Sequence, residues 1–195
     1  SELGVTLDPN SPQASDTIGR IKELEHQGYQ FEGADASLEL LLREAGGEVR
    51  ELFVFESFKM LVEKSAGRPV VSEAFVKLRV GGESLYTAGE GNGPVNALDN
   101  ALRKALLQYY PQLTDMHLSD YKVRVLDDNE ATASKVRVLI ESRDTKNTWS
   151  TVGVSGNVIE ASWEALVDSM RYALLGQEPA VPVAVSEPRP GLLNH

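Results

Sequence analysis

Two glycine-bearing segments are the residues of this sequence that could most readily bind a ligand. The run Gly89–Gly93 precedes a helix that Pro94 is suited to begin, and Gly153–Asn157 precedes another. Glycines at a helix N-terminus let backbone N–H groups approach an anion, so both segments could hold the carboxylate of an amino acid. A tight turn without a ligand is the plainer alternative for each. The glycine spacing does not fit G-x-G-x-x-G, and the flanking strands read as antiparallel, which argues against a dinucleotide site.

Catalytic and metal chemistry find little support in the sequence. The chain has no cysteine, and its three histidines, His26, His117 and His195, share no helical spacing. A thiolate nucleophile and a cysteine-based zinc site are therefore excluded, and neither a histidine metal site nor a Ser–His–Asp triad is indicated. The acidic cluster at 127–130 lacks the alternation of a calcium loop and reads as a solvated turn.

Charge and composition narrow the classes of partner. The 195 residues carry 19 Lys and Arg against 29 Asp and Glu, for a net charge of −10. Such an acidic chain is not expected to bind nucleic acid or an anionic membrane. No apolar run reaches the roughly 18 residues that a membrane span needs, and no signal peptide opens the chain. We expect a cytoplasmic protein whose first residues are the cut edge of a longer one.

The elements that must position these segments begin with two helices. Asp16 is predicted to cap a helix over Thr17–Gln27, and Asp35 a second helix over Ala36–Glu44. Apolar residues recur along both at helical spacing. Two such short helices bury little by themselves, so we expect them to pack on another part of the protein.

Alternating residues then predict three strands and a helix, twice. Strands are expected at 55–64, 70–80 and 84–87 before the first helix, and at 121–126, 136–141 and 149–154 before the second. Seven residue pairs share an offset of 64: Thr87/Thr151, Gly89/Gly153, Gly91/Ser155, Val95/Ile159, Ala97/Ala161, Ala101/Ala165 and Leu102/Leu166. This regularity predicts a duplicated unit. One sheet face covered by one helix is a marginal core, so we expect the units to pair and the chain to form a homodimer.

These patterns predict an α+β fold. Two pseudo-symmetric βββα units, each an antiparallel three-stranded sheet plus a helix, follow a small helical linker subdomain. The expected divisions are a flexible leader at 1–15, the helical linker at 16–50, the duplicated domain at 51–175 and a proline-containing disordered tail at 176–195.

Several long motifs resemble a known family. They are Gly89–Leu106, Tyr121–Asp127, Lys135–Ser142 and Trp149–Leu174, with Arg20–Leu42 upstream. Together they closely resemble the C-terminal regulatory domain and preceding linker of the citramalate synthase and 2-isopropylmalate synthase family. The details are more similar to the citramalate branch.

The resemblance implies a function for the whole protein and a narrower one for this chain. Family enzymes condense acetyl-CoA with a 2-oxo acid, pyruvate in the citramalate branch, in a TIM barrel that uses a divalent metal. Their regulatory domain dimerises and binds the end-product amino acid at the dimer interface as a feedback inhibitor. The chain would then contain no catalytic residue, metal ligand or cofactor of its own. Isoleucine is the expected effector, with leucine sensing, as in 2-isopropylmalate synthase, and a ligand-free dimerisation module as alternatives.

The resemblance also implies an effector pocket. Its expected residues are Gly91, Gly93, Val95, Val125, Asp128, Thr132, Val136, Gly156 and Val158. Branched side chains suit the walls of a site for an aliphatic amino acid, and loop N–H groups suit its carboxylate. The shape difference between isoleucine and leucine is worth only about 1–3 kcal/mol in such a pocket.

Overall fold

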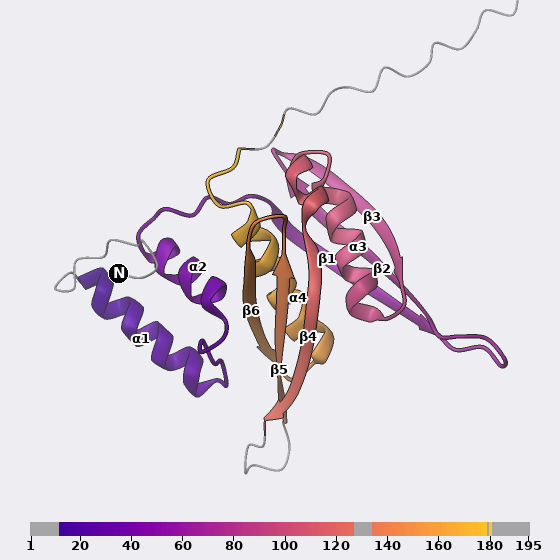
Figure 1. The fold of residues 1–195 in the computed structure, drawn as a ribbon, viewed down its shortest axis with the longest axis horizontal. Coiled ribbons are helices and arrows are strands. Elements are labelled where there is room, and N and C mark those ends of the chain that lie inside the picture. Colours follow the sequence, from indigo (N-terminus) through magenta and orange to yellow (C-terminus); the bar gives the residue numbers. More distant parts are fainter. Residues whose placement is uncertain (1–11, 127–133, 179, 181–195) are drawn as a thin grey trace, which may run out of the picture.

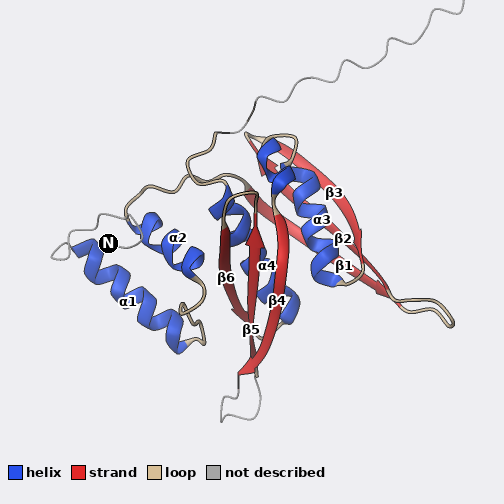
Figure 2. Ribbon diagram, viewed as in Figure 1, coloured by secondary structure: helices blue, strands red, loops and turns tan. Residues whose placement is uncertain are grey.

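The structure, a computed structural model, describes residues 12–126, 134–178 and 180 (Figures 1 and 2). The elements follow in this order: α1 (Pro12–His26), α2 (Asp35–Ala45), β1 (Val54–Glu63), β2 (Val71–Val80), β3 (Glu83–Gly91), α3 (Pro94–Leu106), the 3-10 helix η1 (Pro111–Asp115), β4 (His117–Leu126), β5 (Lys135–Arg143), β6 (Thr148–Ser155) and α4 (Val158–Ala173). No helix in the described ranges is long and apolar enough to cross a membrane.

The predicted duplication is confirmed. The first unit is an antiparallel sheet of order β1-β2-β3 followed by α3, and the second is a sheet of order β4-β5-β6 followed by α4. Val71 and Lys135 begin equivalent strands, and Pro94 and Val158 begin equivalent helices, at the predicted offset of 64. The first strand of each unit even carries a register shift near its start, between Phe55 and Ser57 and between Leu118 and Asp120.

Strand β2 forms as its alternation predicts. Val76 and Leu78 are buried, whereas Lys77 and Arg79 face outward and form ion pairs with Glu56. Gly81 and Gly82 have φ values of 57° and 90°, which the two-residue hairpin turn requires. Because side chains alternate across a strand, β2 offers an apolar face to α3 and a charged face to solvent.

The helix-covered faces of both sheets belong to one hydrophobic core. Leu98, Leu102 and Leu106 of α3 join Leu166 and Met170 of α4 in it. Trp163 of α4 connects the units, because its ring lies 4.7 Å from that of Phe55 and 5.4 Å from that of Phe58, both on β1. Two marginal cores thereby become a single larger one, as the sequence predicted.

The glycine segments are not wholly loops, and this corrects a prediction. Gly89 and Gly91 lie in β3 and Gly153 in β6. A Cβ on Gly89 would lie 2.4 Å from Ala101 N, and one on Gly153 would lie 2.0 Å from Ala161 O. These glycines let a helix backbone approach its sheet closely, a use that sequence cannot distinguish from a turn.

The threonines beside these glycines make the same contact in both units. Thr87 Oγ1 donates to Ala101 O and Thr151 Oγ1 donates to Ala165 O, each at 2.7 Å. Each hydroxyl thus donates its hydrogen bond to a carbonyl of the helix that packs on its sheet.

The two N-terminal helices form and pack on the second unit. Helix α1 begins at Pro12, so the predicted start at Thr17 and the cap at Asp16 are wrong; Pro12 suits a helix start and the helix continues through Asp16. Asp35 is the first residue of α2 and makes no cap. Figure 1 shows α2 beside β6 with α1 on its outer side; α2 contacts β6, α4 and α1. Most of the predicted tail lies outside the described residues.

Candidate effector site

Three of the predicted effector residues lie where β3 gives way to α3. Gly91 ends the strand, Gly93 precedes the helix, and Val95 is half-buried in its first turn. A Cβ on Gly91 would lie 2.4 Å from Ala97 N, so this glycine closes the helix onto the sheet. A Cβ on Gly93 would meet nothing within 4 Å, which leaves the helix start open.

Four more lie at the equivalent end of the second unit. Val125 of β4 pairs with Val136 of β5, and Gly156 and Val158 lie between β6 and the first turn of α4. Because opposite residues share a face, Val125 lies on the face that α4 covers further along the sheet. Val125 is nevertheless 59% exposed and Val158 37% exposed.

Asp128 and Thr132, the remaining two predicted residues, lie outside the described residues. The sequence analysis also passed over Val123, which pairs with the buried Val138 and is 46% exposed. Its alternation with Lys122 and Arg124 was visible, but only the structure reveals that α4 leaves it uncovered.

The two helix starts differ in their polar groups. Asn157 Oδ1 accepts a hydrogen bond from Ile159 N at 2.8 Å and a longer one from Glu160 N at 3.4 Å, so α4 is capped. The residue at the corresponding place in α3 is Gly93, and no side chain caps that helix. The first N–H groups of α3 are therefore available to an anion.

A buried hydroxyl accompanies the uncapped helix. Ser72 is fully buried, and its Oγ has no hydrogen-bond partner among the described residues. It pairs across the sheet with Gly91, on the face that α3 covers. Val136 occupies the equivalent place in the second unit. A buried hydroxyl without a partner costs free energy unless another group binds it.

These residues fall into two groups, one in each unit, which we name the polar half-site and the valine half-site as candidate binding surfaces. The polar half-site consists of Ser72, Gly91, Gly93 and Val95 in the first unit. The valine half-site consists of Val123, Val125, Val136 and Val158 in the second. An amino acid with a branched side chain carries both kinds of group, a carboxylate for the polar half-site and an apolar branch for the valines.

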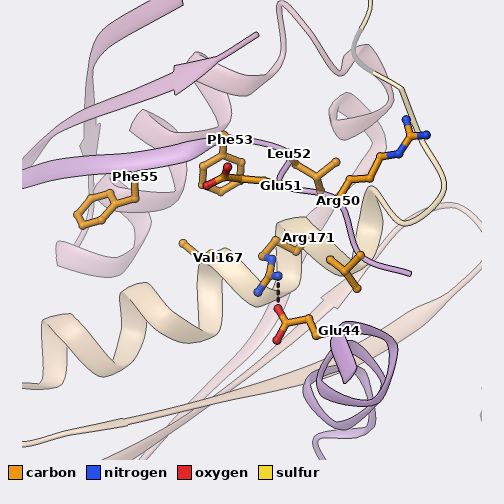
Figure 3. Close-up of a pocket in the computed structure, with 9 residues that line it drawn as sticks. Glu44, Arg50, Glu51, Leu52, Phe53, Phe55, Val167 and Arg171 are labelled. Carbon is orange, nitrogen blue, oxygen red and sulfur yellow. Dashed lines mark hydrogen bonds and ion pairs between the residues drawn. The ribbon is translucent and has the colours of Figure 1, made fainter. Parts of the chain in front are cut away.

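A separate groove of about 410 Å³ lies between α2, α4 and the segment before β1 (Figure 3). Arg171 of α4 and Glu44 of α2 face one another beneath it and form an ion pair. None of the seven predicted effector residues that the structure describes lines it. Its lining consists of Glu44, Val49, Arg50, Glu51, Leu52, Phe53, Phe55, Val167 and Arg171.

No candidate metal site is found in the described part of the chain. There, no group of three or more His, Asp or Glu residues could hold a metal ion. His26 and His117 are both exposed, and they lie on α1 and β4.

Comparison with known proteins agrees with the resemblance read from the motifs. The chain is 51% identical over 178 residues to an (R)-citramalate synthase of Aquifex aeolicus, covering 91% of this chain and 34% of that protein. It is 50% identical over 174 residues to the (R)-citramalate synthase of Geobacter sulfurreducens, covering 89% and 33%. It thus spans about a third of the length of these relatives. Residues 32–174 match the model of the LeuA allosteric (dimerisation) domain, and the chain belongs to that family.

Proposed function

We propose that this chain is the regulatory part of a citramalate synthase, which dimerises and binds isoleucine where two copies meet. The observation that carries the proposal is the pair of half-sites, one polar and one apolar, at equivalent ends of the two units. Bound isoleucine acts as a feedback inhibitor of the parent enzyme. The relatives named (R)-citramalate synthase support this branch over the 2-isopropylmalate branch.

The ligand's groups match the half-sites one by one. Its carboxylate accepts from the uncapped N–H groups of α3, where the helix dipole favours negative charge. Its branched side chain packs on Val125 and Val136.

A second copy gives the site its walls. The half-sites lie on separate sheets, so the polar half-site of one chain can meet the valine half-site of its partner. Val62 and Val125 lie at equivalent places on the two helix-covered faces, because they pair with Ser72 and Val136, and are 53% and 59% exposed. Apolar residues left open at matching places are typical of a surface that a partner covers.

Catalysis belongs to another part of the parent protein. We propose that this part is a TIM barrel that condenses acetyl-CoA with pyruvate to give citramalate, uses a divalent metal, and works in the cytoplasm. The chain itself supplies regulation and no catalytic residue.

Calorimetry and melting curves with isoleucine, leucine and valine test the sensing proposal. Isoleucine should bind best and raise the melting temperature; a ligand at 100 times its Kd stabilises the folded state by about 2.7 kcal/mol. Val125→Asp should abolish this shift, whereas Tyr86→Asp, on the opposite face of the first sheet, should retain it. A preference for leucine would assign the chain to 2-isopropylmalate synthase.

Sedimentation velocity tests the dimer separately. We expect a dimer for the unmodified chain and for Tyr86→Asp, and a monomer for Val123→Asp. A dimer whose melting temperature ignores all three amino acids would make the chain a dimerisation module only.

A further inference from the structure

The α1–α2 hairpin, residues 12–45, is held on the second unit by several polar contacts, among them those of Arg137 and Tyr172 and of two carboxylates of α4. Tyr29 Oη donates to Glu164 Oε2 at 2.8 Å, and the same oxygen accepts from Val154 N at 3.1 Å. Ser37 Oγ donates to Asp168 Oδ2 at 2.9 Å and accepts from Val152 N at 3.1 Å. Glu164 therefore joins Tyr29 to an N–H group on the edge of β6, whereas Ser37 binds such a group directly and Asp168 holds the Ser37 hydroxyl.

The first unit offers no equivalent attachment. The residues 64 positions before Glu164 and Asp168 are Asn100 and Lys104. Asn100 Nδ2 already donates to Glu90 O at 2.7 Å. The two carboxylates thus explain why the hairpin docks on the second of two similar sheets.

Most of the apolar docking surface is a small cluster of its own. Phe31 and Ala34 of the hairpin pack there with Val152 and Val154 of β6. Of residues 12–45, Ala36 alone belongs to the core that α3 and α4 share, so undocking removes one small side chain from that core. Regions joined by few apolar contacts and by solvent-edge hydrogen bonds are those that open locally in folded proteins.

Charge makes the attachment sensitive to protons. Asp168 is faced by Glu164 and Arg171 on its own helix, by Glu44 on α2 and by the Tyr29 phenol from the hairpin turn. Burial raises the pKa of Asp168 to about 6, against the opposing effects of Ser37 and Arg171 and with a contribution from both glutamates. Burial and Glu164 raise the pKa of Tyr29, so this phenol keeps its proton.

We propose that the hairpin is a detachable cover on the edge of β6, held by Glu164 and Asp168, and that it docks more tightly when Asp168 is protonated. Undocking exposes Asp168 to water and returns its pKa toward the ordinary value of about 3.9. Between that pH and about 6 the docked state binds more protons than the undocked state, so docking weakens as pH rises through this window. Above about 6 the weakening is complete.

Hydrogen exchange of the whole 195-residue chain tests the proposal. Protection factors of peptides from residues 12–45, corrected for intrinsic exchange, should fall several-fold from about pH 4.5 to 6.5 and then level off. In Asp168→Asn, which resembles the protonated group, they should stay high across the range. In Lys104→Asn, the matched change in α3, they should follow the unmodified chain.

A second variant separates attachment from folding. Glu164→Ala should lower protection in the hairpin while peptides of α3 and β2 keep theirs, because α3 and β2 belong to the first unit and the hairpin docks on the second. The proposal is overturned if Asp168→Asn follows the pH dependence of the unmodified chain. It is also overturned if hairpin and core always exchange with equal protection, since the hairpin then never detaches alone. Neither outcome depends on isoleucine binding.

Discussion

The two units share one backbone plan and differ in what covers them. In the first, the outer face of the sheet is open, with Phe75 half-buried, Tyr86 65% exposed and the two rings stacked 6.3 Å apart. In the second, the α1–α2 hairpin covers β6, and Val152 and Val154 are buried. The repeat preserves the residues that close each helix on its sheet. It varies those that meet other surfaces.

One difference inside the units is an ion pair in α3. Arg103 forms two hydrogen bonds with Asp99, at 2.8 and 3.1 Å, and donates to Leu113 O and Met116 O. Val167 holds the equivalent place in α4. Arg103→Met should destabilise the fold by about 3–5 kcal/mol in urea unfolding, because it leaves Asp99 buried without its partner.

Val167→Met is the matched control and should cost less than about 1.5 kcal/mol. Equal losses for both variants would mean that the ion pair adds nothing beyond side-chain packing.

The shared glycines should respond alike in both units. Gly89→Ala and Gly153→Ala should each destabilise by about 1–3 kcal/mol, because the new Cβ collides with the backbone of α3 or α4. Urea unfolding of each variant checks this. Gly156→Ala, whose Cβ has open space and whose φ is not positive, is the control and should stay close to the unmodified chain. A neutral Gly153→Ala would return that glycine to the role of a simple turn.

These glycines also mark how far sequence reasoning could go. The strands, the 64-residue repeat and the buried faces could be predicted, because the positions of apolar residues such as Val76 and Leu102 directly show the alternation of a strand and the spacing of a helix. Close approach between two backbones could not be predicted, because a glycine before a helix, such as Gly153, is equally compatible with a turn and with a backbone contact. The Ser72 hydroxyl, which has no partner in the part of the chain that the structure describes, could be found only once its neighbours across the sheet were known.

The helix caps give a smaller contrast. Asn157→Ala should destabilise by about 1 kcal/mol in thermal or urea unfolding, because Ile159 N and Glu160 N lose their acceptor. Asn157→Asp keeps the acceptor and should retain nearly all the stability. Loss of the same size in both variants would place the effect elsewhere in the loop.

The substitution Gly93→Asn gives α3 the N-cap residue of α4. It has the smallest expected effect on stability and is the sharpest test of the polar half-site. Gly93→Asn should stabilise the chain by about 0.3 kcal/mol, since asparagine is only modestly better than glycine at this place. The extended backbone at Gly93, φ −166°, accepts either residue. The new side chain competes for the α3 N–H groups, so calorimetry should find weaker isoleucine binding. Unchanged affinity would exclude a carboxylate at this helix start.

The cover on β6 also bears on how these molecules behave toward one another at high concentration. An open strand edge with apolar neighbours is a template for pairing with strands of other chains, and proteins that expose one tend to aggregate. Ser37 and Glu164 occupy the N–H groups of Val152 and Val154, while Phe31 shields the side chains. Removing the hairpin should therefore lower the solubility of the protein while the rest of the fold persists. Strand β6 would be the first site of strand pairing between molecules.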